Sequence, residues 1–153
     1  MATKTLNHGK NTETNNIIEL FGEPRDFLPA EYVTDETKRE SVMWEVCALP
    51  EQYLEVLLMR YYIELGYEEM AFVLDVNPMR AAYTLIRAET LLKESIEKVL
   101  ERELEYLPVP TDSEPMLTRL FKLDAEAVID PEIIERIRVF AHNVLYGDDA
   151  PSL

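Results

Sequence analysis

The chain has 153 residues, of which 47% are hydrophobic, and its formal net charge is −15 at pH 7. This length suits one ordinary hydrophobic core or two small helical units, and the hydrophobic fraction excludes disorder of the whole chain. The charge disfavours unaided DNA binding, because affinity for duplex DNA comes largely from neutralising its phosphates.

The first 16 residues are polar and without periodicity, and they predict a disordered tail. They lack the apolar centre of a signal peptide, and no later apolar run reaches the ~20 residues of a membrane span. The single cysteine, Cys47, cannot form an internal disulfide and is expected to pack among Trp44, Val46 and Leu49. We therefore expect a cytoplasmic protein without membrane contact. A short apolar cluster over residues 17–27 predicts one or two turns of helix.

Two helices are expected next. Thr34 or Asp35 is placed to cap a helix that runs to Ala48, with Val42 and Val46 on one side. Pro50 suits the first turn of the following helix, which leads to a joint at residues 64–66. The apolar positions of this second helix repeat at steps of 3, 1, 3 and 4, as in an amphipathic helix; they are Leu54, Leu57, Leu58, Tyr61 and Leu65.

A compact helix over residues 67–74, a turn over residues 75–77 and a long helix begun by Pro78 are expected to follow. The apolar stripe of the long helix is Leu85, Ala88, Leu92, Ile96 and Val99. If this helix reaches Tyr106 it is roughly 43 Å long at 1.5 Å per residue. Its distal half then needs a packing partner, and the helices expected near Pro115 and Pro131 are the nearest candidates.

Residues 107–112 hold two prolines and predict a stiff connector. The last helix is expected to begin at Asp130-Pro131 and to end at Gly147. Its predicted apolar face is Ile133, Ile137, Phe140, Val144 and Leu145. The chain is thus predicted to be all-α. We expect a tail over residues 1–16, a helical domain over 17–107 with a helix-turn-helix at 49–93, and a C-terminal helical segment over 108–153.

Catalytic and metal-binding signals are absent from the sequence. His8 and His142 have no ligand-like spacing with Cys47, and the four glycines form no phosphate-binding loop. The alternating Glu101, Glu103 and Glu105 point in different directions on a helix, which predicts a solvated acidic face. We expect no cofactor and no enzymatic activity.

The helix-turn-helix prediction depends on three inward positions. Ala71 is the small residue where the two helices cross, Val76 is expected to plug the core from the turn, and Leu85 anchors the second helix. The alternative is a generic αα-hairpin, which is common and needs no DNA.

Residues 46–93 resemble the fourth conserved region of bacterial RNA polymerase sigma factors. The resemblance is carried by Leu49-Pro50-Glu51, then Glu55-Val56-Leu57-Leu58-Met59-Arg60-Tyr61, then Leu65-Gly66-Tyr67-Glu68-Glu69-Met70-Ala71, and finally Arg87-Ala88. It implies a helix-turn-helix that recognises a promoter element and docks on a flap of the polymerase β subunit. The polymerase-binding second region is not recognisable upstream, so we do not expect a complete, ordinary sigma factor.

The chain departs from the family where DNA would be read. Ala82, Tyr83 and Thr84 stand where the family carries lysine, serine and arginine, and Glu89-Thr90 replaces a basic pair. Asp75 replaces the usual glycine of the turn. Sequence reading normally also needs several phosphate anchors, so two arginines are few. The candidate DNA-binding residues are Asn77, Arg80, Tyr83, Thr84 and Arg87.

Three functional readings remain open. The first is a sigma-like transcription module that contacts RNA polymerase or a regulatory partner and binds DNA weakly. The second is an acidic protein-binding module that mimics nucleic acid, sequesters a basic partner or forms a homodimer through the long helix. The third is a helical domain unrelated to nucleic acid. Most aromatic residues near the motif are expected to pack, whereas Tyr83 suits a DNA groove or a protein interface equally.

Overall fold

The computed structural model describes residues 25–147, so the predicted tail and most of the 17–27 cluster lie outside the described residues. In chain order the elements are β1 (Arg25–Asp26), α3 (Glu31–Thr34), α4 (Glu36–Cys47), α5 (Glu51–Leu57), the π-helical turn η1 (Leu58–Tyr62), α6 (Tyr67–Leu74), α7 (Pro78–Leu100), β2 (Leu107–Pro108), α8 (Met116–Val128) and α9 (Pro131–Tyr146). The all-α prediction is confirmed. β1 and β2 pair antiparallel, with Arg25 opposite Pro108.

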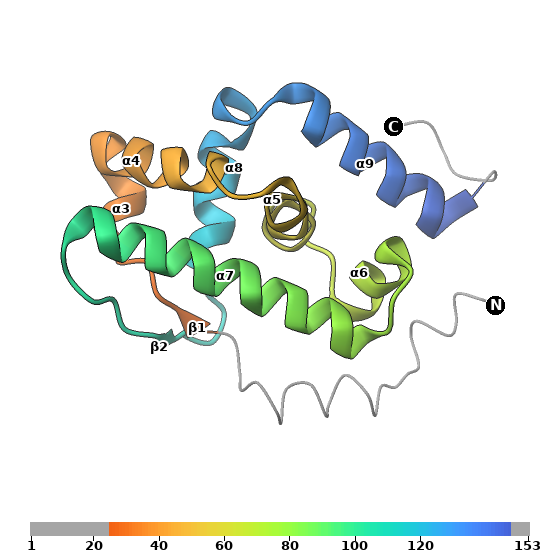
Figure 1. The fold of residues 1–153 in the computed structure, drawn as a ribbon, viewed down its shortest axis with the longest axis horizontal. Helices are drawn as coiled ribbons and strands as arrows, with labels where there is room; N and C mark the ends of the chain where they lie inside the picture. The colour runs from red at the N-terminus through yellow and green to blue at the C-terminus, as the bar shows by residue number, and fades with distance from the viewer. Residues whose placement is uncertain (1–24, 148–153) are drawn as a thin grey trace.

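The helices surround α5 and η1, which are seen end-on near the middle of Figure 1. α7 packs along α5 and α6, and it also contacts α4. On the other sides, α8 packs on η1 and α4, while α9 packs on α6 and η1. The central helix therefore supports both the α6–α7 pair and the two C-terminal helices.

Local capping explains most helix boundaries. The Asp35 carboxylate accepts the Lys38 N–H at 3.1 Å and begins α4, and the Asn77 side chain accepts the Arg80 N–H at 2.8 Å and begins α7. Pro78 and Pro131 take first-turn positions, as predicted. Gly147 ends α9 with a positive φ of 68°, a conformation that glycine adopts without steric cost.

A long-range contact begins α8. Asp26 of β1 accepts the Met116 N–H at 2.9 Å, which ties the first described residues to the C-terminal helices. Burial raises the pKa of Asp26, although this hydrogen bond acts in the opposite direction.

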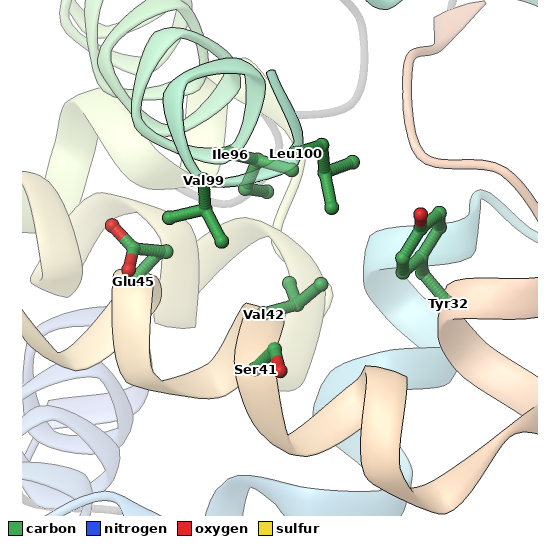
Figure 2. A pocket seen from close by; sticks show the side chains of 7 residues that line it. All are labelled: Tyr32, Ser41, Val42, Glu45, Ile96, Val99 and Leu100. Atoms are coloured by element: carbon green, nitrogen blue, oxygen red, sulfur yellow. The ribbon is translucent and has the colours of Figure 1, made fainter. Parts of the chain in front are cut away.

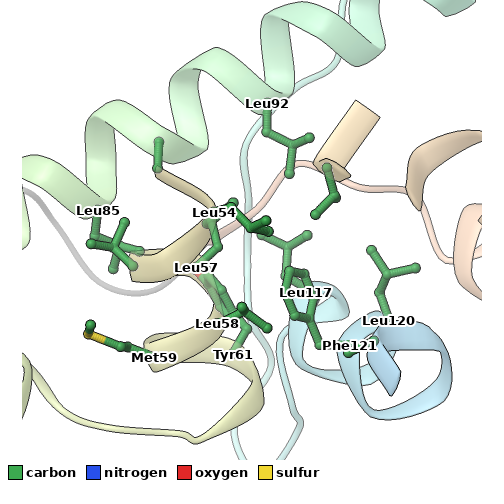
Figure 3. Packing of buried hydrophobic residues seen from close by; sticks show 14 of the residues in the cluster. Leu54, Leu57, Leu58, Met59, Tyr61, Leu85, Leu92, Leu117, Leu120 and Phe121 are labelled. Carbon is green, nitrogen blue, oxygen red and sulfur yellow. The ribbon is translucent and has the colours of Figure 1, made fainter. Parts of the chain in front are cut away.

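One buried cluster joins the central and C-terminal helices. Figure 3 shows Leu85 and Leu92 of α7 facing Leu54 and Leu57 of α5, with side chains of α8 on the far side. Fully buried members include Phe121 and Leu120 of α8, as well as Leu57, Leu58 and Met59. The π-helical turn brings consecutive apolar residues of η1 into this cluster, a feature that the sequence pattern did not predict.

The long helix is shorter than predicted. It ends at Leu100 because Glu101 adopts a left-handed conformation with φ 55°, and the chain then turns back so that Leu104 is buried. The Leu104 N–H donates to the Glu97 carboxylate at 2.8 Å and holds this return. The distal half of α7 packs on α4, and not mainly on α8 or α9 as the sequence suggested.

The prediction that Val76 plugs the core is wrong. Val76 is 39% exposed, and its backbone N–H takes part in the hydrogen bonding that ends α6. Asp75 adopts the left-handed conformation, with φ 59°, and the Val76 N–H donates to the Ala71 carbonyl at 3.0 Å. The turn itself is where the sequence places it, between Leu74 and Pro78. Met70, Ala71 and Leu85 are buried beneath it.

Three other apolar residues face solvent against expectation. Phe140 is exposed because α9 buries Ile134, Ile137 and Ala141, so the true apolar face is rotated from the predicted one. Val99, the residue before the last of α7, is 51% exposed although it continues the predicted stripe. Trp44 is 69% exposed and does not pack around Cys47.

Candidate nucleic-acid interface

The candidate DNA-binding residues lie on the outer face of the first half of α7. Arg80, Tyr83 and Arg87 are spaced by three and four residues, which places them on one side of a helix. All three are exposed, whereas Ala81, Ala82, Leu85 and Ala88 of the same helix are buried against α5 and α6. Small alanine side chains let the neighbouring helices approach this inner face closely.

Two of the five candidate residues serve the helix itself. Asn77 caps the N-terminus of α7 through its side-chain oxygen, which leaves its amide group at the surface. The Thr84 hydroxyl donates to the Arg80 carbonyl at 3.0 Å, one helical turn earlier. The structure therefore brings together three outward side chains, Arg80, Tyr83 and Arg87, and two that also maintain the helix.

The charges of Arg80 and Arg87 face solvent. The Arg80 guanidinium lies 6.0 Å from the centre of the Tyr83 ring, close enough for a weak cation–π contact. Within the described part of the chain, no carboxylate lies at ion-pair distance from either arginine. Both guanidinium groups keep their donors available for an anion such as a phosphate.

Glu89, which replaces a basic family residue, does not add negative charge to this outer face. Its carboxylate accepts a hydrogen bond from the hydroxyl of the buried Tyr61 on η1. Burial raises the pKa of Glu89, while the Tyr61 hydrogen bond and the nearby Arg60 lower it. Burial and the Glu89 charge also raise the pKa of Tyr61 well above its usual value. Glu89 therefore acts as a hydrogen-bond acceptor between α7 and η1.

Arg60 is held away from the candidate face. Its guanidinium donates to the Leu65 carbonyl at 3.0 Å and lies 5.1 Å from the centre of the Tyr67 ring. This contact stabilises the joint that precedes α6, where Glu64 adopts a left-handed backbone. The Glu69 carboxylate accepts the Gly66 N–H at 2.9 Å and begins α6.

Sequence reasoning missed the exposure of Phe72 near the turn, and it placed the exposed Val76 in the core. Phe72 on α6 is 50% exposed, and Val76 follows α6 in the turn. Phe72 lies one turn after Glu68 and Glu69, on the side of α6 opposite to the buried Met70, Ala71 and Val73, so a helical projection would have found it. Phe72, Val76 and Tyr83 are thus exposed apolar side chains of α6, of the turn and of α7.

The described residues also bear on two other kinds of function, metal binding and membrane insertion. Across residues 25–147, no three His, Cys, Asp or Glu side chains are placed to hold a metal ion. The helices of this described part are all too short or too polar to cross a bilayer.

Comparison with known proteins shows a partial similarity between this chain and a bacterial sigma factor. Over 75 residues, 49% of this chain, the sequence is 35% identical to the RNA polymerase sigma factor YlaC of Bacillus subtilis (strain 168). The matched part is 43% of that protein, so the chain covers less than half of this relative. No protein-family model and no solved structure matches the chain. The similarity to sigma factors is therefore partial and diverged.

Proposed function

We propose that this partial relative of sigma factors is a transcription regulatory module that contacts RNA polymerase or a regulatory partner. In this proposal it binds promoter DNA weakly, or only together with that partner, through Asn77, Arg80, Tyr83, Thr84 and Arg87. The observation that carries the proposal is the outer face of α7 in a chain related to a sigma factor, where Arg80 and Arg87 have no carboxylate partner among the described residues.

Electrostatics supports the partner dependence. Two arginines neutralise about two phosphates, so the dependence of DNA affinity on salt concentration is expected to be shallow. The net charge of −15 repels DNA at longer range. A partner that supplies further cations, or that holds the DNA itself, removes this deficit.

The test is a DNA-binding measurement with and without polymerase. Fluorescence anisotropy with a library of promoter duplexes would be recorded for the chain alone and for the chain mixed with purified core RNA polymerase. We expect no tight binding by the chain alone at physiological salt, and selection of particular duplexes in the mixture. The double variant Arg80→Glu and Arg87→Glu should abolish that selection.

A matched control reverses two charges away from the candidate face. Lys98 and Arg119 are exposed and lie in the second half of α7 and in α8. Their replacement by glutamate changes the net charge by the same amount and should preserve duplex selection. Equal losses in the two double variants would show a general charge effect and contradict the proposed interface. Tight DNA binding by the chain alone would contradict the partner dependence.

The alternative function is an acidic protein-binding module that does not bind DNA. The exposed Phe72 and Tyr83 favour it, because aromatic residues are enriched at protein interfaces, as is arginine, and Arg80 lies beside Tyr83. A salt-sensitive DNA complex that is lost on Arg80→Glu and Arg87→Glu would count against it. The homodimer through α7 stays a prediction. Because Leu85, Ala88, Leu92 and Ile96 of the apolar stripe are buried within the chain, such a dimer needs the exposed residues of α7.

A further inference from the structure

A shallow apolar groove lies between α4 and the C-terminal end of α7, far along α7 from the candidate DNA-binding residues. Figure 2 shows Val42 of α4 and Val99 and Leu100 of α7 directed toward the space between the two helices. The buried Ile96 forms part of the floor, and Tyr32 and Glu45 lie toward opposite ends. Val99 is 51% exposed, so the groove has an open apolar wall.

Trp44 continues this apolar surface along α4. Ser41 lines the groove, and Trp44 is three residues later, so the two are neighbours on the helix surface. Trp44 is the single tryptophan of the chain and is 69% exposed. An exposed tryptophan beside an open apolar groove is typical of interface residues that contribute most of the binding energy.

The charge of the α4 side is negative. Within the described chain, Glu36, Glu40 and Glu45 of α4 have no basic partner at ion-pair distance. The two cations of α4 are already engaged: Lys38 pairs with Glu31 at 2.9 Å, and Arg39 pairs with Asp124 at 2.9 Å. Glu40 and Glu45 lie four residues before and one residue after Trp44. On the α7 side, Lys98 and Arg102 are the nearby cations in sequence.

We propose that the groove and Trp44 form a docking surface for a basic amphipathic helix of a partner protein. Apolar side chains of that helix would lie along Trp44 and Val99, and its lysines or arginines would pair with Glu40 and Glu45. The space between α4 and α7 is small, so it would take the tip of one apolar side chain of the partner helix, while the rest of that helix would lie on the exposed surface around Trp44. The inference does not require DNA binding by α7 and can hold if that proposal fails.

The test uses the fluorescence of Trp44 in the full chain. Three tryptophan-free helical peptides would be titrated: one with a leucine stripe and lysines elsewhere, one with the same stripe and glutamates, and one with the lysines but serines in place of leucine. We expect a blue shift of Trp44 emission with the first peptide alone, and weaker binding as salt concentration rises. Equal binding of the second or the third peptide would overturn the proposal.

Paired variants localise the binding. Val99→Lys should weaken binding of the first peptide by about tenfold or more, because it removes an apolar wall and adds repulsion. Leu123→Lys on α8 is the matched control, since Leu123 is 56% exposed and the charge change is identical. The double variant Glu40→Gln and Glu45→Gln should weaken binding and flatten its salt dependence. Equal effects of Val99→Lys and Leu123→Lys would overturn the proposal.

Other occupants of the groove give distinct results. If residues 1–24 or a second copy of the chain covered Trp44, its emission would already be blue-shifted without peptide, and acrylamide would quench it poorly. Sedimentation velocity of the free chain would separate these two cases. Either result would overturn the proposal of a basic partner helix.

Discussion

The arginines of α7 differ from those of α4 and α9 in what their side chains contact. Arg39 of α4 pairs with Asp124 and donates to the Val33 carbonyl, and Arg136 of α9 contacts Glu51 and Glu55. Arg80 and Arg87 have no such partner within the described chain. Arg80 and Arg87 share this state with other cations of the described chain, such as Lys98 and Arg119, for which no ion pair with a carboxylate is formed either. What distinguishes Arg80 and Arg87 is that they share the outer face of α7 with Tyr83, the surface proposed above for DNA.

The largest expected effect comes from removing Phe121, a fully buried aromatic residue of α8. Phe121→Ala should lower the free energy of unfolding by about 3–5 kcal/mol, because the phenyl ring is fully buried and packs against Tyr61. Chemical denaturation monitored by circular dichroism measures this loss. Leu123→Ala, two residues later and exposed, is the control and should have little effect. A small loss for Phe121→Ala would show that α8 is not part of the common core.

The next effect concerns the Arg39–Asp124 pair. Arg39→Ala should lower the free energy of unfolding by about 1–3 kcal/mol, since it leaves a partly buried carboxylate and the Val33 carbonyl without their donor. A double-mutant cycle with Asp124→Asn would measure the coupling between the two side chains. Additive losses in that cycle would contradict a direct interaction.

A smaller effect depends on pH and involves the inner face of α7. The raised pKa of Glu89 in the folded chain means that the folded state binds its proton more tightly than the unfolded state does. This contribution to stability is complete below the ordinary glutamate pKa of about 4.3 and is lost as pH rises through the folded value. The stability of Glu89→Gln relative to the unmodified chain should therefore increase as pH rises from about 4.3 through the folded pKa, and should then level off.

Denaturant titrations at several pH values would check this trend. Glu94→Gln, on the same helix and exposed, controls for the loss of one negative charge. A stability difference between Glu89→Gln and the unmodified chain that is constant with pH would contradict the assigned burial of Glu89.

The smallest expected changes in stability come from replacing two exposed arginines, Arg136 and Arg87. Arg136→Ala should reduce stability at low salt, with an effect that shrinks as salt rises, because its ion pairs with Glu51 and Glu55 are solvent-exposed. Arg87→Ala should change the free energy of unfolding by no more than about 0.5 kcal/mol at any salt concentration. A clear loss of stability in Arg87→Ala would show that Arg87 has a structural partner and weaken its assignment to a binding surface.

Helix boundaries could be predicted from the sequence because capping is local. Pro78, Pro131 and Gly147 lie where the sequence placed them, and Asp35 is one of the two caps that it offered for α4. The cap formed by Asn77 was not predicted, although it too acts on a backbone group three residues away. The turn between α6 and α7 was predictable for the same reason. So was the outward direction of Arg80, Tyr83 and Arg87, since it follows from helical spacing opposite the buried alanines.

Burial and long-range contacts were decided only by the tertiary structure. The exposure of Phe140 depends on which side of α9 meets α6, and the exposure of Val76 depends on the hydrogen bond that ends α6. Glu89 faces inward because Tyr61, 28 residues away in sequence, supplies its donor. Asp26 begins a helix 90 residues later. Periodicity identifies an amphipathic helix, but only the packing of neighbouring helices determines which of its apolar residues leave water.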